Sequence, residues 1–311
     1  MDCPICLASD TRAIYGQVPD FEHGGGTTAK FRACTTCGAL YQYPPPKSDA
    51  LRSIYTPTYR SLQQRGLFSF LKDIVATLQA QRIRRYIPGL HDKVLELGCG
   101  GGHLLRALRR AGYDGLSGVD WAIAPGTSDL DGVKLIAHDI ATYTPDKSLD
   151  LIILNNVLEH LPDPGAILSR YRRCLRPGGR LIVVTPNADS LSRRIFGRFW
   201  AGLHSPWHVF VFSPRALTIL AQRAGCRIRS GSTAAELGSW ALSIQALWRS
   251  LRPAANRAGG SGFGLLTLAV LPFCVPFAYA EQLFGKGSSA FALLEPVEKH
   301  LEQGKTSINP R

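Results

Sequence analysis

Short apolar runs alternate with amphipathic stretches through the middle of the chain. Residues 94–97 form an apolar run with a β-branched start, which predicts a buried parallel strand. The run leads directly into a glycine-rich turn, and leucines at helical spacing then follow at Leu104, Leu105 and Leu108. The order of strand, glycine turn and helix predicts the first crossover of a doubly wound α/β sheet.

Further elements of the same fold are predicted along the chain. The apolar runs that predict other strands are residues 116–119, 133–137, 150–154, 181–184, 226–229 and 291–294. Helical spacing and caps predict helices over residues 67–87, 162–175 and 213–225. Between the second and third strands, residues 121–132 contain Pro125 and Gly126, so we expect an abbreviated or irregular crossover there. The predicted fold class is α/β, a doubly wound Rossmann-like sheet.

The C-terminal part of the chain carries two strongly apolar segments. Residues 237–251 place Trp240 and Trp248 on one stripe of an amphipathic helix. Residues 258–280 contain no charged residue, over a length near that of a bilayer span, but two prolines interrupt them. Our favoured interpretation is a broken apolar element that dips into one membrane leaflet; a buried helical subdomain and a single span are the alternatives. The basic residues expected near anionic head groups are Arg249, Arg252, Arg257 and Lys286.

These patterns divide the chain into four predicted parts. Residues 1–46 form a small unit with four cysteines that ends in a run of three prolines, a stiff spacer. Residues 47–234 form the main α/β domain. Residues 235–285 form an apolar helical insertion between the last two strands, and residues 286–311 contain the last strand and a polar tail.

The composition is that of a globular protein with a basic surface. The 311 residues are 45% hydrophobic and 19% charged, which excludes a disordered chain. The formal net charge of +13 attracts anions such as nucleic acid, phosphate-bearing substrates or an acidic membrane face, although a basic surface without a partner fits equally well. The first residues have no basic region followed by an apolar one, so we expect a cytoplasmic protein.

The eight cysteines predict a metal site rather than a set of disulfides. Cys3 and Cys6 form one pair with two intervening residues, and Cys34 and Cys37 form a second. Two such pairs suit a tetrahedral structural Zn²⁺ site, with one ion per chain, in a reducing compartment. The other cysteines stand alone in apolar surroundings and are expected to be buried: Cys99, Cys174, Cys226 and Cys274.

The glycine turn after the first strand indicates a cofactor that contains a nucleoside. Its spacing is G-x-G-x-G, at Gly98, Gly100 and Gly102, and His103 stands where a dinucleotide fingerprint would need a further glycine. The second strand ends in Asp120, which is placed to accept both hydroxyls of a ribose. The altered spacing argues against NAD.

Five segments in order resemble the class I S-adenosylmethionine-dependent methyltransferases, in particular the group with a zinc ribbon ahead of the catalytic domain. The segments are Glu96–Gly102, Gly118–Asp120, His138–Ile140, Leu149–His160 and Arg176–Val184. The resemblance implies S-adenosylmethionine as cofactor. It implies that Glu96 holds the methionine amino group, that Asn155 contacts the methionine portion, and that Asp139 and Ile140 lie on the adenine side. Trp121 would supply an apolar wall there.

Histidines near the expected ligand edge of the sheet are candidates for the catalytic base. If the acceptor is a hydroxyl group, a base must take its proton, and histidine suits this role near neutral pH. His160 follows the fourth strand, while His204 and His208 lie in a loop after the fifth. We select His160 and His208 as catalytic candidates; the alternative is that they cap or pack locally.

The acceptor class expected from the sequence is a small molecule, a sugar or a lipid-linked compound, with peripheral contact to the cytoplasmic face of a membrane. A zinc-ribbon nucleic-acid-binding protein, for instance an RNA methyltransferase, is the second hypothesis. The basic charge favours it, but no compact patch interleaves basic and aromatic residues. A subunit that binds the cofactor without catalysis is the third, and the intact Glu96, Asp120 and glycine turn argue against it. No feature of the sequence selects an oligomeric state.

Overall fold

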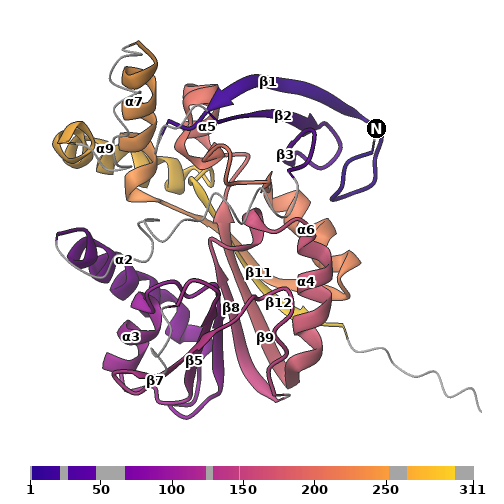
Figure 1. Ribbon diagram of the computed structural model, residues 1–311, viewed down its shortest axis with the longest axis vertical. Coiled ribbons are helices and arrows are strands. Elements are labelled where there is room, and N and C mark those ends of the chain that lie inside the picture. Colours follow the sequence, from indigo (N-terminus) through magenta and orange to yellow (C-terminus); the bar gives the residue numbers. More distant parts are fainter. Residues whose placement is uncertain are drawn as a thin grey trace, which may run out of the picture.

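The computed structural model describes residues 2–21, 27–46, 67–123, 129–146, 148–251 and 265–297. Its centre is a mixed eight-stranded sheet in the order β11-β12-β9-β8-β4-β5-β7-β6, with helices on both faces (Figure 1). The strands are β4 (Val94–Leu97), β5 (Leu116–Asp120), β6 (Asp129–Leu130), β7 (Val133–Ala137), β8 (Leu149–Asn155), β9 (Leu175–Pro186), β11 (Cys226–Ala234) and β12 (Ser289–Pro296).

Strand β4 is the point at which the order of the parallel strands reverses. It pairs in parallel with β5 on one side and with β8 on the other. Crossovers that leave a strand in opposite directions open a crevice at its carboxyl end, where open α/β sheets bind ligands. The antiparallel pairs are β12 with β9 and β11, and β6 with β7. The predicted Rossmann-like sheet is confirmed.

Alternate side chains of the central strands enter two separate cores. Leu95 and Ile152 pack with helices α4 (Pro164–Tyr171) and α6 (Pro214–Arg223). Val94 and Leu151 pack on the opposite face with α2 (Leu67–Ile83) and α3 (His103–Arg110). This two-residue period follows from the strand pleat, and it explains why strands covered on both faces are apolar throughout.

Helix boundaries follow the capping signals of the sequence. Ser213 Oγ accepts a hydrogen bond from the Ala216 amide at 3.0 Å, with Pro214 at the first helical position, as predicted. The predicted helix 67–87 is α2 followed by the 3-10 turn η2 (Arg84–Tyr86). The remaining 3-10 turns are η3 (Leu158–His160), η4 (Arg172–Cys174), η5 (Gly197–Phe199) and η6 (Ala201–Leu203).

The crossover between β5 and β7 is abbreviated, in agreement with its proline and glycine. The short strand β6 pairs in antiparallel fashion with β7, and no helix stands between β5 and β7 in the described part of this crossover. Residues 124–128, which include Pro125 and Gly126, lie outside the described residues.

A second sheet joins the N-terminal segment to the main domain. Its strands are β1 (Thr11–Pro19), β2 (Thr28–Cys34), β3 (Leu40–Gln42) and β10 (Phe210–Val211), in that order. β10 belongs to the chain after β9, and it pairs with β3 at Phe210–Tyr41 and Val211–Leu40. The sheet of the N-terminal unit therefore includes a strand from the main domain, which the sequence analysis did not anticipate.

Helices α7 (Leu237–Leu251) and α9 (Leu265–Leu283) lie between β11 and β12 in the chain, as predicted for the apolar insertion. The expected break at Pro272 and Pro276 is absent, because both prolines lie inside α9. Residues 258–264 lie outside the described residues. Helix α5 (Leu191–Phe196) packs beside this pair (Figure 1).

A buried carboxylate joins α5, α7 and α9. Glu281 is fully buried, and its Oε1 accepts hydrogen bonds from the Ser192 amide and hydroxyl, both at 2.9 Å. Its Oε2 accepts a hydrogen bond from Trp240 Nε1 at 2.8 Å. A buried acid is stable only with such partners, so these contacts fix α9 against the rest of the protein.

Candidate cofactor and acceptor site

The turn after β4 has a backbone that only glycine adopts easily. Gly98, Gly100 and Gly102 have φ angles of 68°, 51° and 71°. A Cβ at Gly98 would also lie 2.5 Å from Val157 Cγ2, so a side chain at this position would clash. The turn therefore presents bare backbone at the carboxyl end of the sheet, where a ligand can approach closely.

Asp120 is held against this turn. Its Oδ2 accepts from the Gly100 amide at 2.8 Å, and its Oδ1 accepts from the Ala122 amide at 2.9 Å. Burial raises the pKa of Asp120, while the two amide bonds oppose that rise. The amides orient the carboxylate and leave acceptor capacity for hydroxyl groups of a bound ribose.

Glu96 is a buried acid without a complete set of partners. Its side chain is 4% exposed, and Oε2 has no hydrogen-bond partner among the described residues. Burial, and secondarily the nearby charge of Asp120, raise the pKa of Glu96 well above its usual value. An orphaned buried acceptor at this position fits the ammonium group of an amino-acid ligand, which would supply the missing donor and a compensating charge.

Helix α2 is tied to the site by two polar contacts. Asn155, at the end of β8, donates from Nδ2 to Gln79 Oε1 at 3.1 Å, while its buried Oδ1 has no partner in the described part of the chain. Asp73 pairs with His103 Nδ1 at 2.8 Å and accepts from Arg106 at 3.2 Å. His103, the residue that departs from the dinucleotide fingerprint, thus anchors α2 beside the glycine turn, a role that sequence analysis missed.

The remaining predicted cofactor residues lie at or near the ends of β5 and β7. Asp139 follows β7 and accepts from the Ala141 amide at 2.8 Å. Ile140 is buried in the core, and its carbonyl accepts from the Tyr171 hydroxyl at 2.7 Å. Trp121 directly follows Asp120 and is 48% exposed. Their contacts with adenine stay a prediction.

Three histidines from two distant segments of the chain come together in the structure. The ring centroids of His160 and His208 lie 4.6 Å apart, and those of His204 and His208 lie 4.9 Å apart. His160 Nδ1 contacts the Trp207 carbonyl at 3.1 Å, and His208 Nδ1 contacts the Gly202 carbonyl at 2.9 Å. Since a carbonyl only accepts, both Nδ1 atoms carry the hydrogen, and the Nε2 lone pairs are the reactive positions.

Glu159 completes this group, and sequence analysis gave it no role. It is fully buried; Oε2 accepts from Thr185 Oγ1 at 2.9 Å, and Oε1 lies 3.9 Å from His208 Nε2. Burial raises the pKa of Glu159 to about 8 and lowers that of His160 to about 3. Burial and the neighbouring imidazoles lower the pKa of His208 well below its usual value. Both imidazoles are therefore neutral at pH 7, and neither takes up a proton easily.

The N-terminal sheet supports the loop that carries His204 and His208. Gln42 donates from Nε2 to the carbonyls of Pro206 at 2.6 Å and of His208 at 2.8 Å. Ser205 Oγ donates to the Val18 carbonyl at 2.7 Å. The loop is thus held from both sides, by the main domain and by β1 and β3.

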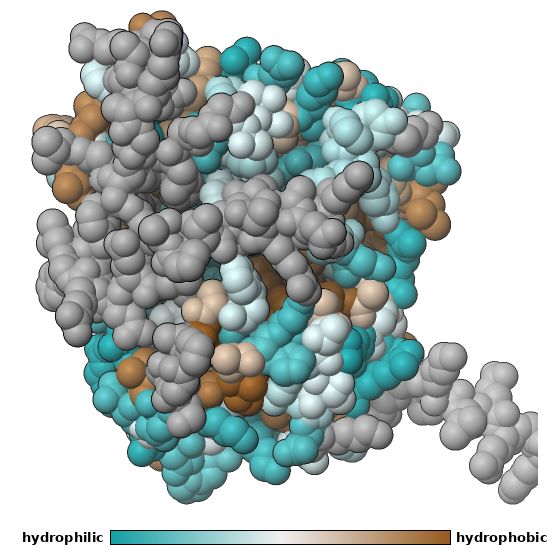
Figure 2. Space-filling model, in the orientation of Figure 1, coloured by the Kyte–Doolittle hydropathy of each residue, from teal (hydrophilic) through white to brown (hydrophobic). Residues whose placement is uncertain are grey.

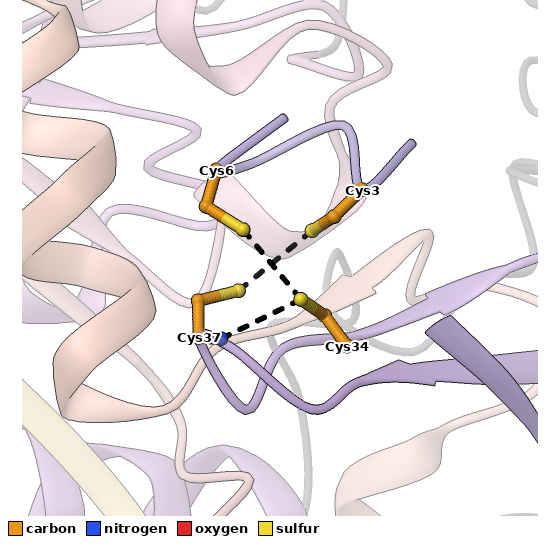
Figure 3. Close-up of side chains that lie close together, drawn as sticks. All are labelled: Cys3, Cys6, Cys34 and Cys37. Atoms are coloured by element: carbon orange, nitrogen blue, oxygen red, sulfur yellow. Dashed lines mark hydrogen bonds between the residues drawn. The ribbon is translucent and has the colours of Figure 1, made fainter. Parts of the chain in front are cut away.

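Four cysteine sulfurs converge at the end of this sheet (Figure 3). Cys3 and Cys37 Sγ are 3.7 Å apart, Cys6 and Cys34 Sγ are 3.5 Å apart, and all four lie within 4.8 Å of one another. A tetrahedral site with Zn–S bonds of about 2.3 Å has sulfur–sulfur edges of about 3.8 Å, so the residues fit the ion. The four other cysteines are buried, as predicted: Cys99, Cys174, Cys226 and Cys274.

Comparison with known protein families identifies the family to which this fold belongs. A family model described as "Methyltransferase domain" matches residues 59–230, more than half of the chain. The ubiquinone biosynthesis O-methyltransferase of Aeromonas salmonicida is 36% identical over 112 residues, which cover 32% of this chain and 46% of that protein. The trans-aconitate 2-methyltransferase of Acidovorax sp. is 33% identical over 107 residues, covering 33% and 42%. The chain thus spans less than half of these two relatives.

Solved structures show the same fold. A Burkholderia thailandensis 1,6-didemethyltoxoflavin-N1-methyltransferase, solved with 1,6-didemethyltoxoflavin and S-adenosylhomocysteine, aligns with a TM-score of 0.51 at 15% identity, over 85% of this chain and 97% of that one. The [4+2]-cyclase SpnF also aligns with a TM-score of 0.51 at 15% identity, over 81% and 97%. At such identities the likeness concerns the fold alone. The family match shows that the chain belongs to the methyltransferase-domain family, and the geometry of the glycine turn agrees with this membership.

Proposed function

We propose that this protein is an S-adenosylmethionine-dependent methyltransferase that methylates a hydroxyl group of a small-molecule, sugar or lipid-linked acceptor. The observation that carries the proposal is that the segment after β8 both touches the cofactor turn and carries part of the histidine group. Val157 contacts Gly98 and precedes η3, which carries Glu159 and His160. Bound S-adenosylmethionine supplies an electrophilic methyl group, and the chain has to position the acceptor and assist the loss of its proton. His160 and His208 are assigned to this step: as neutral imidazoles they would accept a hydrogen bond from the acceptor hydroxyl at Nε2.

A pocket beside the histidines is the proposed acceptor site. It lies between the N-terminal sheet, the loop after η5 and helix α7. Phe21, Phe199 and Leu242 give it an apolar wall, and His204 connects it to the histidine group. Such a lining suits an apolar or aromatic acceptor. The printed names of the relatives, for ubiquinone biosynthesis and trans-aconitate, also refer to small molecules.

The cofactor contacts are proposed from the residues that line the turn. Glu96 and Asn155 face the methionine portion with unsatisfied oxygens, and Asp120 accepts from the ribose hydroxyls. Asp139, Ile140 and Trp121 border the adenine side. The three turn glycines let the backbone approach the ligand.

The four N-terminal cysteines are proposed to hold one structural Zn²⁺. Their sulfur distances fit the tetrahedral ion without rearrangement, and Cys3, Cys34 and Cys37 are buried. The ion would fix the ends of β2 and the turn before β3, and through Gln42 it would stabilise the loop of His208.

Helix α9 is proposed to rest on the cytoplasmic face of an anionic membrane rather than to span it. Its inward stripe carries small or polar residues, Thr267, Cys274, Ala278 and Glu281. Its outward side carries the large apolar ones: Phe273 is 75% exposed, Phe277 58% and Leu283 86%, and Phe284, directly after the helix, is 78% exposed. Figure 2 shows apolar residues in brown at the surface of this region. A helix in a protein core carries its large apolar residues inward. The exposed apolar side of α9 is therefore suited to burial against a membrane or another molecule.

The hydrogen bonds of Glu281 oppose a spanning role. In the described residues, α9 is the helix long and apolar enough to cross a bilayer, and only 22% of residues Leu266–Leu283 are buried. Extraction of α9 would break the contacts of Glu281 with Ser192 and Trp240. A shallow contact keeps them and buries the outer face in the interfacial region.

Basic residues border the exposed apolar face of α9. Arg194 and Arg198 are exposed on α5 and η5, and Lys286 follows α9. The Leu191 amide, at the start of α5, bonds to the Lys286 carbonyl at 3.1 Å, so Lys286 lies beside the start of α5. Arg249 was expected at the head groups, but it is buried and donates to the Phe21 carbonyl. Arg252 and Arg257 lie outside the described residues.

The Asp120→Asn substitution should weaken binding of S-adenosylmethionine by about tenfold or more, because a charge-assisted contact to the ribose is lost. Isothermal titration calorimetry measures the affinity. Asp146, an exposed carboxylate, provides the control substitution Asp146→Asn. Equal affinities for the parent and Asp120→Asn would refute the assignment of the ribose contact.

The His160→Ala and His208→Ala substitutions should lower methyl transfer by about a hundredfold or more while cofactor affinity changes little. The parent, incubated with labelled S-adenosylmethionine and fractionated small-molecule and lipid extracts, identifies an acceptor for the comparison. Unchanged transfer rates in both variants would assign the histidines a packing role. Labelling of nucleic acid instead of these extracts would contradict a small-molecule acceptor.

The Cys34→Ser substitution should remove one equivalent of zinc from the purified protein, because a tetrahedral site loses affinity without one thiolate. Plasma mass spectrometry gives the stoichiometry. Cys274→Ser changes an isolated buried cysteine and should keep the parent's zinc content. A Cys34→Ser protein with the full zinc content would show that these cysteines do not bind the ion.

The triple substitution Phe273→Ser, Leu283→Ser and Phe284→Ser should reduce co-sedimentation with anionic vesicles by about tenfold, because each exposed side chain contributes apolar burial. Leu90→Ser, 51% exposed on another surface, is the control. Parent protein that stays in the supernatant with anionic vesicles contradicts the proposal. Dimerisation of the parent that the triple variant abolishes, without vesicle binding, would assign the face to a second copy.

A further inference from the structure

Glu159, His160 and His208 have the arrangement of a metal site separate from the four cysteines. A carboxylate oxygen and two imidazole nitrogens lie within 4.8 Å of one another. Glu159 is fully buried, yet its Oε1 has no hydrogen-bond partner among the residues that the structure describes. Since buried carboxylate oxygens are nearly always paired, this orphaned atom, aimed at His208 Nε2 3.9 Å away, indicates a missing ligand.

Hydrogen bonds from neighbouring groups fix the orientation of the three side chains. The Nδ1 atoms of His160 and His208 bond to backbone carbonyls at 3.1 and 2.9 Å, which directs each Nε2 lone pair away from the backbone. Thr185 Oγ1 donates to Glu159 Oε2 at 2.9 Å and leaves Oε1 for the ion. Ligating histidines and carboxylates characteristically have such outer hydrogen bonds, which fix the tautomer and the ring orientation.

We propose that Glu159, His160 and His208 bind a divalent transition-metal ion of the Zn²⁺ or Co²⁺ type through one carboxylate oxygen and two imidazole nitrogens. Two histidines and one glutamate form a ligand set for a site with an open fourth position. Donor separations of about 3.3 Å are expected around Zn²⁺, so the 3.9 Å between Glu159 and His208 requires only small side-chain rotations. His204 Nδ1 lies 3.4 Å from His208 Nε2, and the ion would replace this long contact.

The ion would deepen the proposed function, on which this part of the inference rests. Its open position can take water or an acceptor oxygen, and a metal-bound hydroxyl loses its proton to water more readily than a free one. His160 and His208 would then assist the loss of the acceptor proton as ligands of the ion. The ion would also join η3 to the loop after η6.

Metal stoichiometry tests the site without reference to activity. The full-length protein is stripped with a chelator and reloaded with excess Co²⁺, and bound metal is counted after gel filtration. We expect two equivalents in the parent and one each in Glu159→Gln, His208→Ala and Cys34→Ser. The remaining ion in Cys34→Ser should show no thiolate-to-cobalt charge-transfer band, whereas that of Glu159→Gln should show it. His138→Ala, which removes an exposed imidazole, should keep two.

The outcome is decisive even if one variant fails to fold. Any variant that binds S-adenosylmethionine like the parent can be counted. The parent alone overturns the inference if it binds a single equivalent with the thiolate-to-cobalt band, or binds none. Retention of two equivalents by folded Glu159→Gln and His208→Ala would also overturn it. A parent with one equivalent that still transfers methyl groups refutes the metal site and leaves the proposed function intact. A parent that binds two equivalents but transfers no methyl group to any acceptor would support the metal site and refute the proposed function.

Discussion

The pairing of β10 with β3 is the contact on which the arrangement of the site depends. It joins the four-cysteine unit to the chain segment that follows the loop of His204 and His208. Gln42, at the end of β3, then donates to two carbonyls of that loop. Without this support the loop would have few regular backbone partners, because it contains only short 3-10 turns. The N-terminal unit is therefore part of the framework of the candidate site.

The site is built from buried acids that lack complete partners. Glu96 and Glu159 each have one orphaned oxygen among the described residues, and burial raises the pKa of both. A buried carboxylate without a complete set of partners destabilises the protein when no ligand is bound, and a cationic ligand reduces this free-energy cost. S-adenosylmethionine carries a sulfonium and an ammonium group, which suits the position of Glu96. The environment of Glu159 suits a metal ion, because two imidazoles face the same oxygen.

Glu281, unlike Glu96 and Glu159, is a buried acid with hydrogen-bond partners at both oxygens. Four donor groups surround its two oxygens, from Ser192, Trp240 and Ser288. This network holds α9 with its small residues inward and its phenylalanines outward. The hydropathy of the segment alone suits a membrane span, whereas the packed helix suits a surface contact. The hydrogen bonds of the buried Glu281 side chain account for this difference, because they hold α9 against the protein.

The sequence by itself determined the central sheet, the cofactor turn and the cysteine site. Val94–Asp120 is a local unit in which strand, positive-φ glycines, helix and terminal acid follow one another, so local chemistry decides its form. The same holds for Ser213 and Pro214 at the start of α6. Tertiary structure decided what distant segments do together. It brought Glu159 and His160 to His208, paired β3 with β10, and turned the aromatic side of α9 outward. No local pattern encodes these contacts, because each depends on where long connections return the chain and on which buried groups must then find partners.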